Sequence, residues 1–136
     1  MATVGRGTTS KAPASRTRGH IQNKLRSLID AHLTARGGSC SIITAPRVVP
    51  RVRSDSNFRV PDLGVTCTDY EREELNLTDP VLLIEILSPS NPAETWTNVW
   101  VYTTIPSVQE ILIVHSTAIR TDLLQLDASG NCRNAL

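Results

Sequence analysis

The sequence predicts a single mixed α/β domain, in which a long helix precedes a sheet and a second helix interrupts the order of the strands. Three observations predict this class. Apolar residues recur at helical spacing from His20 to Arg36. The run 80–88 is apolar on both faces, as in a strand that is covered from both sides of a sheet. A further helical pattern at 93–104 is followed by two strand-like segments.

The N-terminal half gives one helix and two strands. Residues 1–15 are rich in Gly, Thr, Ser and Ala without periodicity, which predicts a disordered tail. The helix at 20–36 should end at Gly37-Gly38. Segment 39–49 reads as a strand, and segment 58–67 alternates between apolar and other residues, as a half-buried strand does.

The central part predicts a strand and a helix. Segment 68–79 is polar and acidic, which is typical of a loop or a short solvated helix. The apolar strand at 80–88 follows, and Asn91 before Pro92 is a good helix start. The inner face of the helix at 93–104 is expected to carry Trp96, Val99 and Trp100.

The C-terminal part predicts two more strands, at 108–115 and 119–126. We therefore expect one folded domain at 16–128, between the tail at 1–15 and a C-terminal tail at 129–136.

Composition excludes some classes of protein. The 136 residues are 40% apolar and 20% charged, as in ordinary globular domains. No apolar run approaches the roughly 20 residues needed to span a bilayer, and no signal-peptide pattern is visible. The three cysteines, Cys40, Cys67 and Cys132, are scattered and odd in number. This pattern argues against a disulfide framework and a zinc site, and it favours a cytoplasmic location.

Basic residues are concentrated near the N-terminus, although the net charge is only +1. The first 26 residues hold six basic residues and no acid. Arg18 and Lys24 are the candidates within this group for contacts to a nucleic-acid backbone. A merely solvated surface explains the same pattern.

Glu85 is the only charged residue in the apolar strand at 80–88. A buried carboxylate must be protonated, paired with a cation or bound to a metal, because apolar neighbours cannot replace its hydration. Asp62 lies in the preceding strand and could share a metal with Glu85, with the main-chain carbonyl of Ile86 as a further ligand. Mg²⁺ prefers such hard oxygen ligands. The alternative is that Asp62 caps a turn after Pro61 while Glu85 pairs with an arginine.

Three segments carry a resemblance to a known family: Arg59-Val-Pro-Asp62, Pro80-Val-Leu-Leu-Ile-Glu-Ile-Leu-Ser-Pro-Ser90, and Tyr102 with Ile105-Pro-Ser-Val-Gln-Glu-Ile-Leu-Ile-Val114. From about Pro13 to Leu126 the chain resembles the Uma-type restriction endonuclease family of the PD-(D/E)XK nuclease superfamily. The resemblance implies a restriction-endonuclease-like core that hydrolyses DNA phosphodiester bonds. It also implies Mg²⁺ or Mn²⁺ as cofactor, Asp62 and Glu85 as metal-binding acids, and the option of a homodimer.

The chain departs from the family at its catalytic lysine. Leu87 stands where the superfamily usually has this lysine, two residues after the glutamate, and Asn98 stands where the Uma-type family supplies it from the helix. Only two lysines, Lys11 and Lys24, occur in the chain. We therefore keep three hypotheses: an endonuclease with Asp62, Glu85 and Asn98 at its catalytic site, an inactive relative that binds DNA or a protein partner, and a gene fragment with no settled function.

Overall fold

The computed structural model describes residues 16–50, 58–69, 74–87, 89–90 and 92–135. The elements are, in order, α1 (Arg16–Arg36), β1 (Ser41–Thr44), β2 (Leu63–Thr66), β3 (Pro80–Leu87), α2 (Pro92–Tyr102), β4 (Glu110–His115), β5 (Thr121–Leu126) and β6 (Cys132–Asn134). The predicted mixed α/β class is confirmed. The tail predicted at 1–15 and the helix start predicted at Asn91 lie outside the described residues.

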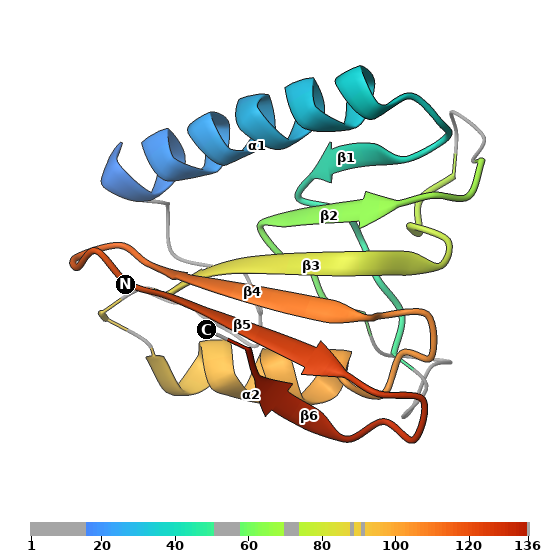
Figure 1. Ribbon diagram of the computed structural model, residues 1–136. Helices are drawn as coiled ribbons and strands as arrows, with labels where there is room; N and C mark the ends of the chain where they lie inside the picture. The colour runs from blue at the N-terminus through green and yellow to red at the C-terminus, as the bar shows by residue number, and fades with distance from the viewer. Residues whose placement is uncertain (1–15, 51–57, 70–73, 88, 91, 136) are drawn as a thin grey trace.

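The strands form one mixed sheet in the order β1-β2-β3-β4-β5-β6 (Figure 1). Neighbouring strands are antiparallel except for β3 and β4, which are parallel. A parallel pair needs a crossover connection, and α2 provides it here. The crossover therefore carries α2 back across one face of the sheet, beside β3.

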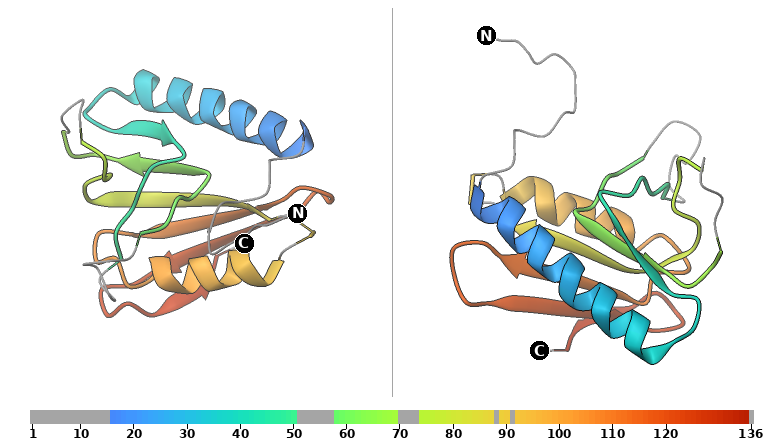
Figure 2. Two further views of the ribbon diagram at one scale, coloured as in Figure 1. Left: turned by 180° about the vertical axis from the view of Figure 1, so that it is seen from behind. Right: turned by 90° about the horizontal axis from the view of Figure 1, so that it is seen from above.

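The two helices cover opposite faces of the sheet (Figure 2). On one face, Leu25, Ile29 and Leu33 of α1 pack against buried residues of β1, β2 and β3. On the other face, Val99 and Tyr102 of α2 pack against Leu83 of β3 and against Ile111 and Ile113 of β4. Each face thus has its own apolar core, and the apolar character of β3 on both sides follows from its central position.

Helix α1 begins at Arg16, one turn before the apolar periodicity that starts at His20, and ends where the sequence places its end. Gly37 and Gly38 follow with φ angles of 75° and 105°, which residues with a side chain rarely adopt. The Gly37 N–H donates to the Thr34 carbonyl at 3.2 Å, so the last turn closes as a glycine-capped helix end.

Strands β1 and β2 are shorter than the predicted segments 39–49 and 58–67. Ala45 has a φ angle of 49°, which turns the chain out of the extended conformation directly after β1. Between Ala45 and β2, the described residues form isolated bridges, from Arg47 to Asn76 and from Val48 to Arg59. The apolar pattern of the sequence continues through these bridged residues, but the regular pairing of β1 with β2 does not.

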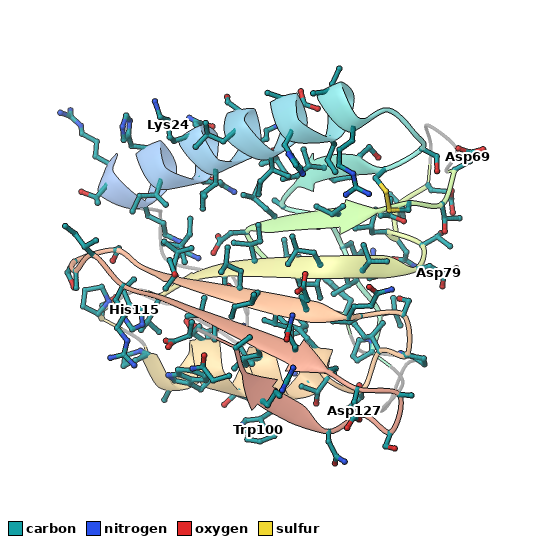
Figure 3. All side chains as sticks on the ribbon, viewed as in Figure 1. Lys24, Asp69, Asp79, Trp100, His115 and Asp127 are labelled. Atoms are coloured by element: carbon teal, nitrogen blue, oxygen red, sulfur yellow. A yellow bond between two sulfur atoms is a disulfide. The ribbon has the colours of Figure 1, made fainter. Side chains whose placement is uncertain are left out.

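The predicted inner face of α2 was wrong for two of its three residues. Trp96 and Trp100 are 38% and 69% exposed, and Trp100 points away from the sheet in Figure 3. The buried residues are Thr95, Val99 and Tyr102, at i, i+4 and i+7. The helix is therefore rotated so that a tyrosine, rather than the tryptophans, faces β3.

The predicted C-terminal tail at 129–136 contains β6, so the chain continues the sheet there. Leu124, Gln125 and Leu126 of β5 pair with β6, whose three residues are exposed. Neither described helix is long and apolar enough to span a bilayer.

The expectation of no disulfide was wrong, because Cys40 and Cys67 are disulfide-bonded (Figure 3). The pair directly continues the β1–β2 ladder beyond the partners Ser41 and Thr66. Register between two strands brought the cysteines together across 27 positions, and no local spacing could show it. Cys132 is a free thiol and exposed.

Candidate active site

Asp62 lies directly before β2, at the point where the β2–β3 ladder ends. Its main-chain N–H donates to the Ile84 carbonyl at 3.1 Å. Its side-chain Oδ2 accepts the N–H of Ile86 at 2.8 Å. The carboxylate thus takes the place that a main-chain carbonyl of β2 would have taken, and it is only 6% exposed. This bond fixes the carboxylate in line with the sheet, between its two faces.

Helix α1 reaches Asp62 with two side chains. Arg18 Nη2 donates to both carboxylate oxygens, at 2.9 and 3.2 Å. Gln22 Nε2 donates to the main-chain carbonyl of Asp62 at 2.8 Å. Residues four apart lie on the same side of a helix, so the first turns of α1 are attached to Asp62 twice.

Glu85 lies on the other face of β3 from Ile84, toward α2, and is 2% exposed. The phenolic O–H of Tyr102 donates to its Oε2. Burial raises the pKa of Tyr102 well above its ordinary value, and the charge of Glu85 and its hydrogen bond raise it further. The phenol therefore stays protonated near neutral pH and remains a donor to the buried carboxylate.

Both acids raise the pKa of the Tyr102 phenol, Glu85 from β3 and Asp62 from the position directly before β2. The charge of Asp62 also raises the pKa of Tyr102, whereas the charge of Arg59 lowers it. Both carboxylates therefore raise the pKa of Tyr102, although Asp62 is bonded to α1 and Glu85 to α2. The alternative from the sequence paired an arginine with Glu85, whereas in the structure Arg18 pairs with Asp62.

Asn98 lies one turn before Tyr102 on α2, and its Oδ1 accepts Arg59 Nε at 3.0 Å. Arg59 Nη1 donates to the Phe58 carbonyl at 3.1 Å. The predicted lysine position is therefore occupied by an amide that holds an arginine.

Of the remaining predicted site residues, Ile86 and Arg18 contact Asp62, whereas Lys24 lies away from it. Ile86 is in the site through its main chain, because its N–H is bonded to Asp62. In an extended strand the N–H and C=O of one residue face the same side, so the Ile86 carbonyl faces the side of Asp62 too. Arg18 is drawn into the site, whereas Lys24 is exposed and points away from the sheet (Figure 3).

Sequence reasoning assigned no role to Tyr102, Gln22 or the side chain of Arg59. Tyr102 follows Asn98 by four residues on a helix, so their shared side of α2 was the available signal. Gln22 gave none.

The described residues contain no group of three or more His, Cys, Asp or Glu side chains placed to hold one metal ion. A metal site here would therefore need main-chain and solvent oxygens in addition to the two carboxylates. A surface hollow of about 740 Å³ lies elsewhere, beside Glu110, Gln125 and Arg133, and neither acid lines it.

We expect Tyr102→Phe to lower stability by about 1–3 kcal/mol at neutral pH, since it removes a donor from the buried Glu85 carboxylate. Because the folded-state pKa of Tyr102 is raised, its contribution is complete below the unfolded-state pKa of about 10 and is lost as pH rises above it. Urea unfolding of both proteins at pH 8 and pH 11 measures the free energy of unfolding at each pH. The wild-type protein should lose stability over this interval more steeply than the Phe variant, and equal losses would contradict the assignment.

A third buried acid, Asp122 on β5, lies in a separate cluster. His115 Nε2 is 3.0 Å from Asp122 Oδ2, and Asn134 Nδ2 donates to Oδ1 at 3.2 Å. Arg120 lies 3.6 Å from the same carboxylate. The hydrogen bond to His115 holds the pKa of Asp122 below its ordinary value, against the opposing effect of burial.

This cluster predicts a dependence of stability on pH. A depressed pKa means that Asp122 stabilises the fold above an unfolded-state pKa of about 3.9 and that this stabilisation is lost as pH falls through the lower folded-state pKa. We expect Asp122→Asn to lower the melting temperature at pH 7 more than at pH 3. Scanning calorimetry at both values measures the difference, and the same loss at both would refute it.

Comparisons with known proteins agree with this fold. A family model described as "Uma2: Putative restriction endonuclease" matches residues 5–135. The uncharacterized protein slr1290 of Synechocystis sp. is 32% identical over 113 residues, which cover 82% of this chain and 58% of that protein. The chain thus spans less than two thirds of that relative's length.

A solved structure is similar as well. It is a "putative nuclease belonging to DUF820" from Anabaena variabilis, with a TM-score of 0.67 and 16% identity over 91% of this chain and 69% of that one. At this identity the match shows the fold alone. Together with the family model, which covers almost the whole chain, it confirms the predicted family: the chain belongs to the Uma2 family of restriction-endonuclease-like proteins.

Proposed function

We propose that this protein is a divalent-metal-dependent endonuclease that hydrolyses DNA phosphodiester bonds, with Asp62 and Glu85 as its metal-binding acids. One observation supports the proposal most strongly: Asp62 and Glu85 are both buried at the end of the β2–β3 ladder, where the Asp62 carboxylate bonds to the N–H of Ile86, the residue after Glu85. A buried acid is costly to a fold, and two of them near each other are costlier still, so a cation between them gives a reason for their placement.

The donor set fits Mg²⁺ or Mn²⁺. These ions take one or two carboxylates and complete their shell with water and substrate phosphate, so a third acidic ligand is not required. Asp62 and Glu85 would be the carboxylate ligands, and the Ile86 carbonyl faces the correct side to be a further ligand. When bound, the metal would activate a water molecule and neutralise charge on the phosphate.

The protein's own residues prepare this site in two ways. The bond from Ile86 N–H fixes the Asp62 carboxylate, and the Tyr102 phenol fixes that of Glu85. The guanidinium of Arg18 bonds to both oxygens of Asp62, so it lies where substrate phosphate would approach. We keep Arg18 as a proposed DNA contact, with the exposed Lys24 as a proposed contact farther along the backbone.

The proposal is tested with purified protein and supercoiled plasmid, with Mg²⁺, with Mn²⁺ and with chelator, beside Asp62→Asn. We expect nicking that requires the metal and is lost in the variant. Nicking that persists in Asp62→Asn would show that the acids do not carry it.

A second candidate function is an inactive relative that binds DNA or a protein partner. Asn98 favours it, because a neutral amide cannot supply the charge of a lysine. Plasmid binding without nicking, under all metal conditions, would support this candidate.

A homodimer is likewise a proposal, which the mass measured by light scattering tests. The cytoplasmic location remains a prediction, since the disulfide removes the cysteine argument for it.

A further inference from the structure

In the described structure, hydrogen bonds hold both the main chain and the side chain of Arg59. Its main chain forms a two-way bridge with Val48, in which each N–H donates to the other's carbonyl at 2.9 Å. Its side chain donates from Nε to Asn98 Oδ1 and from Nη1 to the Phe58 carbonyl. Hydrogen bonds from two different nitrogens restrict the guanidinium to a narrow range of orientations.

The position of this guanidinium relates it to the acids. Arg59 precedes Asp62 by three residues, and Asn98 precedes Tyr102 by four on one side of α2. Arg59 thus bonds to α2 one turn before the tyrosine that bonds to Glu85. These contacts place a cation next to the segments that carry the two carboxylates.

The chemistry of Asn98 fits an arginine partner. Its Oδ1 accepts a hydrogen bond, which an ammonium group cannot do, and its amide adds no charge beside the guanidinium. A lysine at position 98 would instead bring a second cation near the first, and like charges repel. The asparagine is therefore compatible with Arg59 in a way that the expected lysine is not.

We propose that Arg59 is the cation that contacts the phosphate to be cleaved, and that Asn98 is the residue that positions it. This inference rests on the proposed endonuclease function. Arginine suits the role because it is always charged and its planar fork matches the oxygens of a phosphate. It supplies the positive charge at the site that the family's lysine position does not.

Nicking rates test the catalytic part. We expect Arg59→Ala to lower kcat about 100-fold or more, since removal of one donor to a developing negative charge has effects of this size. Arg59→Lys should recover part of the loss, because it restores charge without the fork. Asn98→Ala should lower kcat with little change in KM, and Asn98→Lys should lower it too. Arg133→Ala, an exposed arginine on β6, is the matched control and should keep the wild-type rate.

Binding of a short fluorescent DNA duplex, measured by anisotropy with Ca²⁺ and increasing NaCl, separates this inference from the proposed function. Loss of one phosphate contact reduces the log–log salt slope by about one. We expect this reduction in Arg59→Ala and not in Arg59→Lys or Arg133→Ala.

The outcomes are distinct. A wild-type protein that never nicks, with a reduced slope in Arg59→Ala, overturns the function and keeps Arg59 as a phosphate contact. A wild-type protein that nicks, with an unchanged rate and slope in Arg59→Ala, overturns the inference alone, and so does higher turnover in Asn98→Lys. Circular dichroism of each variant identifies loss of fold. If Arg59→Ala unfolds, the prediction is carried by Arg59→Lys, with an unchanged slope and a lower kcat.

Discussion

Replacing Glu85 with Gln should reduce metal-dependent nicking at least about 100-fold while the domain stays folded. The estimate is a minimum, because removal even of groups that only support a metal ligand costs 10–100-fold in affinity or activity. Gln has the same shape as Glu, and its carbonyl oxygen can still accept the O–H of Tyr102. What the variant removes is the negative charge, which a divalent cation needs and the apolar core does not.

Glu110→Gln is the matched control for this prediction. Glu110 belongs to the same sheet, at the start of β4, and bonds to Gln125 away from the site at 3.0 Å. Its variant should nick at the wild-type rate. If both variants lost activity equally, the loss would reflect general damage to the sheet. If Glu85→Gln kept full activity, Glu85 would not be a metal ligand.

Removal of the Cys40–Cys67 disulfide should lower the stability of the oxidised protein by about 3–4 kcal/mol. The bond closes a loop across 27 positions, and the conformational entropy of such a loop in the unfolded chain gives this magnitude. Unfolding in urea compares the wild-type protein with the double variant Cys40→Ser, Cys67→Ser. The double variant should unfold at a lower urea concentration.

Cys132→Ser is the control here, because this exposed cysteine is free. It should leave the midpoint of unfolding unchanged. A reducing agent should shift the midpoint of the wild-type protein to that of the double variant and have no effect on the variant itself. Equal midpoints for the oxidised wild type and the double variant would contradict the prediction.

The elements that the sequence predicted well are those whose signal is local. Strand β3 and helix α1 carry continuous apolar patterns, and Gly37 marks the end of α1 through its own conformational freedom. The ends of β1 and β2 were less predictable, since a positive φ at Ala45 breaks the ladder without interrupting the pattern. The rotation of α2 was mispredicted, because hydrophobicity favours burial of tryptophan and does not report the bond between Tyr102 and Glu85.

In the candidate site, too, residues with a local signal were predicted and residues from distant segments were not. Glu85 was conspicuous as one charge in an apolar strand, and Asp62 followed from its motif and the resemblance. Their partners were not predictable, because they come from distant parts of the chain. Arg18 reaches Asp62 across 44 positions and Tyr102 reaches Glu85 across 17. The crossing of helices over a sheet decides such contacts, and no spacing within one segment encodes it.

Calorimetric titration with Mn²⁺ tests the central claim most directly, because it measures the metal site without requiring turnover. The wild-type protein is compared with Asp62→Asn, Glu85→Gln and the control Glu110→Gln. If the two buried acids hold the metal together, the wild type and the control bind Mn²⁺ with the same affinity, and each acid variant binds it at least about tenfold more weakly. Unchanged binding in both acid variants, or no binding by the folded wild-type protein, would contradict the account.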